Sequence, residues 1–400
     1  MVITGQEYDV IRTVLGISTL VLSARLFAAV AYRLKIPGVI GEIFAGIVFG
    51  PYALGSFLQI LGAPLIDLNP LFLSFSQIGS VIVLLSIGLS FMPADLLSSG
   101  IAGSAVALFG VLVPFTLGYL ATNYLGFGTN ANALIVGASL TATSIAITYE
   151  VLRELKKHKT KEAKIMVSAA IVDDILGIII LSIVLAIAEN DTLAIGSIAA
   201  QFIFTFVVWI SLAVLAMVFA PRVIKLISRS ESDGAVEAGV TMLTFSFAIF
   251  AMFLGMSPIV GAFVVGMSLS KSEFYKKIRS FVSHLMMIFG PLFFAVIGTY
   301  LNPAVISLQN AYMIAIFLVI AVASKYVGCA LPSMLFLRDW KKASTIGIGM
   351  ATRGEIGFII LGVALAGGVI STTIYSVLLV VLIATGIVAS ILLHGAYGGE

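Results

Sequence analysis

Apolar segments of the length needed to cross a lipid bilayer follow one another along almost the whole chain. A membrane-spanning helix needs about 20 mostly apolar residues. About thirteen such segments are predicted, near residues 11–32, 38–56, 71–92, 101–124, 131–153, 165–188, 193–219, 238–256, 258–270, 283–300, 308–332, 343–366 and 371–394. The sequence therefore predicts an all-α polytopic membrane protein.

The composition supports this class. Hydrophobic residues make up 60% of the chain and charged residues only 10%, whereas soluble domains contain about 25% charged residues. The single cysteine, Cys329, excludes an internal disulfide. The three histidines are not spaced with other ligands as in a metal cluster. We expect no cofactor, and no enzyme.

Basic residues test the orientation, because they collect in cytoplasmic loops. With the N-terminus outside and every segment spanning, the inner loops contain all but four of the 22 basic residues. Those loops are 33–35, 153–164, 222–229, 271–279 and 338–342. We expect a multi-pass protein of the cell (cytoplasmic) membrane with its C-terminus inside. The net charge of +3 then reflects orientation and gives no reason to expect nucleic-acid binding.

Two adjacent carboxylates, Asp173 and Asp174, lie in the middle of the apolar segment 165–188. Each ionised carboxylate at the centre of a membrane helix costs roughly 2.5–3.5 kcal/mol, so such residues usually face a polar cavity or a partner. The doublet therefore indicates an ion or proton site.

Two other segments contain residues typical of interrupted helices. Segment 131–153 has Thr141-Ala142-Thr143-Ser144 at its centre, and segment 343–366 has Ala351-Thr352-Arg353-Gly354-Glu355. Unwound backbone is tolerated in a membrane where it lines a cavity, and its ends can bind ions. Thr141, Ala142, Thr143, Ser144 and Thr352 are thus possible ion ligands. Close helix packing explains the hydroxyls equally well, and a structural ion pair is the favoured role for Arg353 and Glu355.

These two segments occupy corresponding positions in two predicted halves. Residues 1–192 would form a first repeat of six helices with its core near 71–188. Residues 193–237 would be a connector helix, and 238–400 a second repeat with its core near 283–366. Because the connector is a single helix, the two halves have opposite orientations in the membrane, as in inverted-repeat transporters with a midplane site. The whole chain, 1–400, is expected to be one transporter unit.

At the level of motifs the chain resembles the cation:proton antiporter family, nearest its NapA- and NhaA-like bacterial and archaeal sodium/proton antiporters. The resemblance covers nearly the whole chain. It rests on five stretches in order: Ile36–Gly46 with Gly50-Pro51, Thr141–Thr148 followed by Val172–Gly177, Ser257–Phe263, Ser324–Gly328 and Gly349–Gly357. Thr352, where relatives commonly have proline, and Ser90, where many have an acidic residue, depart from the pattern.

The resemblance implies a fold and roles. It implies an NhaA-like fold with two crossed interrupted helices, and a homodimer in which a mobile core carries the ion. Asp174 resembles the carboxylate that binds the sodium ion and the proton. Asp173 resembles its partner carboxylate, and Lys325 the membrane lysine that pairs with Asp173.

The doublet also suggests how exchange would work. With Lys325 paired to Asp173, an ionised Asp174 leaves a net negative charge that is costly in a low dielectric. Either a proton or a sodium ion neutralises it, so the two compete for one site. If Lys325 is only structural, one proton exchanges for one sodium. If it also releases its proton, the cycle carries charge, which the resemblance favours.

We therefore predict a sodium (or lithium)/proton antiporter that serves pH homeostasis. Three alternatives stay open at this point: a potassium/proton antiporter of the same fold, a sodium-coupled symporter of an organic anion, and a passive cation channel. Glu42, in the segment 38–56, is expected to have a structural hydrogen-bonding role.

Overall fold

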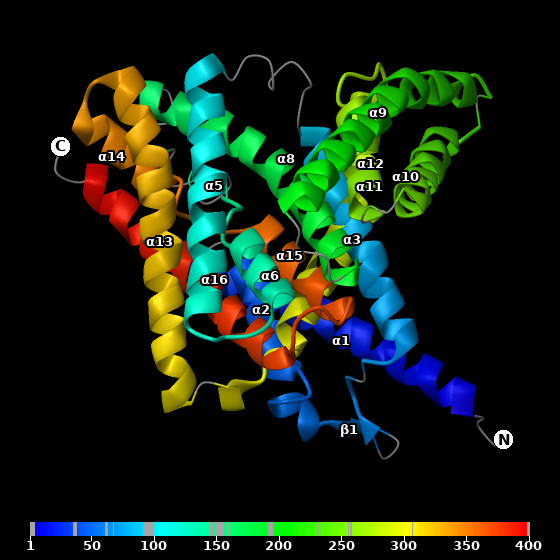
Figure 1. The fold of residues 1–400 in the computed structure, drawn as a ribbon. Coiled ribbons are helices and arrows are strands. Elements are labelled where there is room, and N and C mark those ends of the chain that lie inside the picture. The colour runs from blue at the N-terminus through cyan, green and yellow to red at the C-terminus, as the bar shows by residue number, and fades with distance from the viewer. Residues whose placement is uncertain are drawn as a thin grey trace. The chain divides into compact units, whose positions relative to one another are not determined.

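The protein is almost entirely helical (Figure 1). The computed structural model describes residues 5–34, 38–60, 63–66, 68–90, 100–144, 148, 152, 156–157, 160–190, 195–230, 232–254, 256, 258–305 and 307–397. Within these ranges, ten helices are long and apolar enough to cross a membrane. Two short strands, β1 (Gln59–Ile60) and β2 (Ala63–Pro64), form an antiparallel pair. The prediction of an all-α polytopic membrane protein is confirmed, apart from this small hairpin.

Contacts divide the chain into two compact units. Unit 1 comprises Met1–Pro93 and Ile203–Pro303. Its helices are α1 (Gly5–Arg33), α2 (Gly38–Phe49), η1 (Leu54–Ser56), α3 (Pro70–Ser90), α10 (Ala235–Phe253), α11 (Pro258–Leu269) and α12 (Tyr275–Thr299). Within unit 1, α3 packs against α11 and α12, and α2 packs against α1 and α12. The α2–α12 contact is very close, because a Cβ added at Gly298 would lie 1.9 Å from the carbonyl oxygen of Ile43.

Unit 2 comprises Ala94–Phe202 and Ala304–Glu400. Its helices are α5 (Gly100–Tyr124), α6 (Asn130–Ser139), α8 (Lys161–Asn190), α13 (Leu308–Leu337), α14 (Trp340–Gly349), α15 (Glu355–Ala366) and α16 (Thr372–Tyr397). Helix α9 (Ile195–Ser228) begins in unit 2 and continues in unit 1, and η2 (Pro303–Val305) lies at the second boundary. In unit 2, α5 packs against α6, α8 and α13, while α13 also packs against α14 and α16.

The helix bounds differ from the apolar segments at several ends. Helix α12 begins at Tyr275 and α8 at Lys161, both earlier than predicted, and α13 continues to Leu337. The added turns of α8 and α12 contain lysine or arginine, which are good helix formers, so the backbone continues where the apolar segment stops. The added turn of α13, residues 333–337, is mostly apolar. Helix α2 is shorter than predicted and ends at Phe49, since the residue before Pro51 is disfavoured in a helix.

Two spans are interrupted where polar residues and glycines predicted it. In 343–366, α14 ends at Gly349 and α15 begins at Glu355. In 131–153, α6 ends at Ser139, and residues 145–147, 149–151 and 153 of that segment lie outside the described residues. The contact grouping cuts across the predicted halves: each unit takes residues from both 1–192 and 238–400, and the expected core helices α3 and α12 group with unit 1. The inverted repeat stays a prediction.

The close α2–α12 contact predicts that the stability of the protein is sensitive to substitution of Gly298. Gly298→Ala should lower the melting temperature of the purified protein, because overpacking of this kind costs about 1–3 kcal/mol. Thermal unfolding in detergent, followed by size-exclusion chromatography, measures it. Gly395→Ala is the matched control, since a Cβ there meets nothing within 4 Å. Equal melting temperatures for the two variants would contradict the packing.

Candidate ion site

An ion pair lies buried inside unit 2. Asp173 comes from α8 and Lys325 from α13, and both side chains are fully buried. The Lys325 ammonium nitrogen (Nζ) lies 2.7 Å from Asp173 Oδ1 and also donates to the carbonyl oxygen of Thr141. Because taking both charges out of water is costly, such a pair is tolerated only with good geometry and further hydrogen bonds. The Thr141 carbonyl supplies one of these bonds.

A second buried cation shares the same acceptor. Arg353, 1% exposed, donates through Nη1 to the carbonyl oxygens of Thr141 and Ala142, each at 3.1 Å. Its Nη2 donates to the carbonyl of Ala321 on α13 at 2.8 Å. The guanidinium thus joins three parts of unit 2: the end of α6, the middle of α13 and the link between α14 and α15. The side chain of Glu355, its expected ion-pair partner, lies outside the described residues.

The interruption of α6 explains why two cations gather here. The last carbonyls of a helix have no intrahelical partner, and its C-terminus carries roughly half a negative charge. Helix α6 ends at Ser139 with Leu140 as its C-cap, and the carbonyls of Thr141 and Ala142 belong to the unwound backbone that follows this negative end. Lys325 and Arg353 satisfy these acceptors and oppose their partial charge.

The two interrupted segments also bind each other. The Ser144 amide donates to the carbonyl of Thr352 at 3.1 Å, and the Thr143 hydroxyl donates to the carbonyl of Met350 at 3.2 Å. The Thr148 hydroxyl lies 2.7 Å from the Gly349 carbonyl and 2.8 Å from the Thr352 hydroxyl. These bonds satisfy backbone groups that neither helix satisfies. In the described structure the hydroxyls therefore hold the crossing together, while their oxygens keep acceptor capacity.

Two polar atoms in this cluster have no hydrogen-bond partner among the described residues. They are Oδ2 of Asp173 and Nε of Arg353, and both are buried. A buried unsatisfied atom in a native protein points to strain, to an unplaced water or ion, or to a chemical role. The free carboxylate oxygen is therefore a natural place for a proton, a water molecule or a cation.

The remaining predicted residues lie as follows. Asp174 is the next residue of α8, and its side chain lies outside the described residues. Glu42 lies in α2 of unit 1, with its Oε1 3.7 Å from Nη1 of Arg25, and so belongs to a separate cluster.

Sequence reasoning named Arg353 as a structural residue but missed its backbone partners, the carbonyls that follow α6 and that of Ala321. It also missed Thr148, which bonds to the opposite interrupted segment. Thr148 had a local signal, since it follows Ser144 by four residues and bonds back to its carbonyl at 3.1 Å. The Ala321 carbonyl had none, because a backbone group carries no mark in the sequence.

The buried pair predicts a strong energetic coupling. Asp173→Asn and Lys325→Gln should each destabilise the protein by about 3–5 kcal/mol, because each leaves a buried charge uncompensated. The double variant should lose clearly less than the sum of the two. Thermal unfolding of the four proteins measures this.

The exposed pair of Lys225 and Glu273, 2.9 Å apart in unit 1, is the matched control. Such surface pairs contribute about 0–1 kcal/mol, so Lys225→Gln and Glu273→Gln should have little effect. Additive effects at Asp173 and Lys325 would rule out the pair as a coupled unit.

Comparison with known proteins places this chain in a family. The profile described as "Sodium/hydrogen exchanger, transmembrane" matches residues 19–396. The chain is 29% identical to the Na(+)/H(+)-K(+) antiporter GerN of Bacillus cereus, with 96% of each chain covered. It is also 29% identical to the high-affinity Na(+)/H(+) antiporter NhaS3 of Synechocystis, covering 96% of this chain and 90% of that one.

A solved structure shares the fold. The sodium proton antiporter MjNhaP1 from Methanocaldococcus jannaschii superposes with a TM-score of 0.74 at 17% identity, covering 98% of both chains. Because the family profile spans nearly the full length, and the relatives are antiporters by name, this chain belongs to the transmembrane sodium/hydrogen exchanger family.

Proposed function

We propose that the protein exchanges sodium (or lithium) ions for protons across the cell membrane, with Asp174 and Asp173 as the ion- and proton-binding carboxylates. The observation that carries this proposal is the buried pair of Asp173 and Lys325 at the crossing of two interrupted segments. Membership of the sodium/hydrogen exchanger family supports it. The transported substrates are the cation and the proton, and the proposal involves no cofactor and no enzymatic step.

The hydrogen bonds of the cluster explain why Asp174 would be the exchanging group. Among the described residues, Arg353 donates only to backbone carbonyls. Its positive charge is therefore opposed by the partial negative charge of the backbone at the end of α6. Lys325 compensates Asp173. We expect an ionised Asp174 to add a net negative charge next to this pair, which is costly in a low dielectric. A proton or a sodium ion would neutralise it, and each would exclude the other.

Competition becomes transport if the site faces the two sides of the membrane in turn. If only the neutralised forms reorient, every cation carried one way is matched by proton movement the other way. The hydroxyls of Thr143 and Thr352, with the carbonyls of the crossing, are candidates for further ion ligands. A sodium ion prefers oxygen ligands, and both hydroxyl oxygens keep acceptor capacity.

The finer architecture is also proposed. Ten candidate spans, the short helix α11 and the two interrupted segments would give thirteen spans in an NhaA-like arrangement of two inverted repeats. An odd number of spans puts the two termini on opposite sides of the membrane, and the positions of the basic residues favour an outside N-terminus and an inside C-terminus. The family resemblance supports a homodimer.

Potassium is the second candidate ion. The name of GerN includes potassium, and selectivity among monovalent cations depends on cavity size and ligand number. The organic-anion symporter and the passive channel are disfavoured, because the matching family is one of exchangers.

Proteoliposomes with an imposed pH gradient and an internal pH dye test the exchange. External sodium should dissipate the gradient in the parent, and Asp174→Asn should reduce this response by at least tenfold, because an amide cannot carry the exchanged proton. The control is Asp339→Asn, an exposed N-cap residue outside the spans that asparagine can replace.

The responses to the ions decide between the candidates. A response to potassium and not to sodium would overturn the ion assignment. No response to any cation, or an undiminished response in Asp174→Asn, would remove Asp174 from the mechanism.

The role of Lys325 predicts a dependence on membrane potential. If Lys325 releases its proton when the cation binds, the parent should exchange faster under a potential that favours its net charge movement. Lys325→Gln should lose that dependence, since glutamine has no proton to release. Potassium diffusion potentials set with valinomycin, applied during sodium-driven exchange, measure it. If the exchange rate of the parent does not depend on the membrane potential, Lys325 has a purely structural role.

A further inference from the structure

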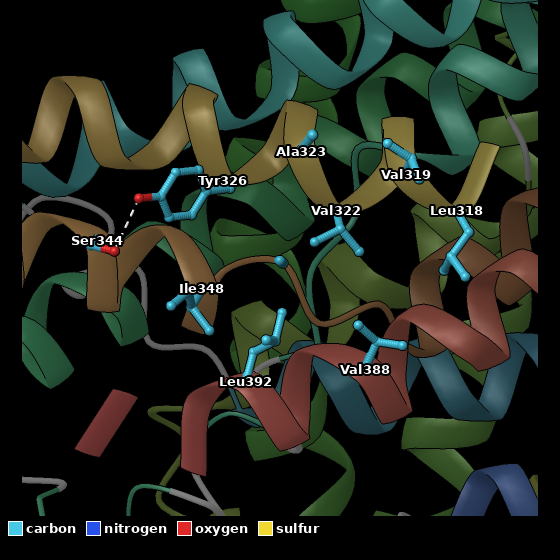
Figure 2. A pocket seen from close by; sticks show the side chains of 10 residues that line it. Leu318, Val319, Val322, Ala323, Tyr326, Ser344, Ile348, Val388 and Leu392 are labelled. Atoms are coloured by element: carbon cyan, nitrogen blue, oxygen red, sulfur yellow. Dashed lines mark hydrogen bonds between the residues drawn. The ribbon is translucent and has the colours of Figure 1, made fainter. Parts of the chain in front are cut away.

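An apolar groove lies between α13, α14 and α16 in unit 2 (Figure 2). Its volume is about 550 Å³, and its walls are aliphatic side chains such as Val322, Ile348 and Leu392. Two polar side chains, Tyr326 and Ser344, line one end of it, and their hydroxyls bond each other at 3.0 Å. Its aliphatic lining offers few hydrogen-bond partners to water. The groove therefore suits a hydrocarbon chain.

The helix register places this groove next to the ion site. On α13, Val322 and Tyr326 are four residues apart and line the groove, while Lys325 bonds to Asp173. Ala351 also lines the groove. It stands between Met350, whose carbonyl accepts from Thr143, and Thr352, whose carbonyl accepts from Ser144. A molecule in the groove would thus pack against the crossing itself.

One end of α14 offers a site for a negatively charged headgroup. Lys341 precedes Ser344 by three residues and Ile348 by seven, so the three share one face of the helix. Lys341 therefore lies about 4.5 Å along the helix axis from the groove-lining Ser344. Residues 338–342 carry three basic side chains and one acidic one, Asp339, which caps α14 and lies 3.5 Å from Lys342 Nζ. The excess charge at this end is positive.

Trp340 indicates how deep the first turn of α14 lies in the membrane. It is the first residue of α14 and is half exposed. Tryptophan is enriched where membrane proteins cross the headgroup region, and each basic residue there attracts anionic lipid by about 1 kcal/mol. The apolar groove and the basic end of α14 thus match the tail and the headgroup of one lipid.

We propose that this groove binds one acyl chain of an anionic phospholipid, whose phosphate lies against Lys341 and Lys342. The lipid packs on α13 and on the peptide around Ala351, and so stabilises unit 2 behind the ion pair. This site is independent of which cation the protein exchanges.

The two tryptophans make the binding measurable. Trp209→Phe leaves Trp340 as the chain's sole tryptophan, and bromine atoms on lipid chains quench tryptophan fluorescence on contact. The protein is reconstituted in bilayers of phosphatidylcholine with increasing brominated phosphatidylglycerol, or with brominated phosphatidylcholine. We expect phosphatidylglycerol to quench Trp340 at about tenfold lower mole fraction than phosphatidylcholine.

Paired variants distinguish a specific lipid-binding site from general attraction of anionic lipid to a basic surface. Lys341→Gln and Lys342→Gln should each reduce the preference, by up to about fivefold, whereas Lys276→Gln in unit 1 should not. Ala323→Phe, which fills the groove, should abolish the preference. Leu331→Phe is its control, because Leu331 is exposed on the same helix and does not line the groove.

Two outcomes would overturn the proposal. One is equal quenching by both lipids in the parent. The other is a preference that survives Ala323→Phe and falls only with the lysines or with added salt, which would mean surface attraction alone. Each variant's melting temperature is measured in pure phosphatidylcholine, so that loss of binding is distinguished from loss of fold.

Discussion

The interruption of α6 is the constraint on which the rest of unit 2 depends. A helix that stops inside a membrane exposes carbonyl groups in a region of low dielectric, and leaving them unsatisfied costs several kcal/mol each. Here the Thr141 carbonyl accepts from both Lys325 and Arg353. Lys325 in turn requires a counter-charge in the low dielectric, and Asp173 on α8 supplies it. One broken helix thus draws two cations and one carboxylate into a single buried cluster.

The second interruption is coupled to the first by hydroxyl groups. Thr143 and Thr148 donate across to the carbonyls at the end of α14, and Thr352 reaches back to the carbonyl of Ser144 at 3.1 Å. A proline at position 352 would have no hydroxyl for this bond. Thr352 therefore adds a polar contact at the centre of the crossing. Because each segment satisfies the other's backbone, neither is expected to move alone.

Helix α13 connects the cluster to the lipid-facing side of unit 2. One of its faces carries Lys325 and the Ala321 carbonyl, which accepts from Arg353. Another carries Val322 and Tyr326 in the apolar groove. A change in packing on the groove side is therefore transmitted through a single rigid helix to the ion pair. This gives membrane composition a direct physical route to the site, without any contact between lipid and ion.

The sequence by itself determined the membrane class, the approximate spans, the two interruptions and the carboxylate doublet, because apolar length, hydroxyls, glycines and buried charges are local signals. The expected pairing of Arg353 with Glu355 stays a prediction, because the Glu355 side chain lies outside the described residues. The sequence did not predict the bonds of Arg353 to backbone carbonyls. It also missed the Ala321 carbonyl and the groove behind α13. Only the tertiary structure decided these, because a carbonyl acceptor or a groove wall is created when separate helices pack and has no residue type of its own.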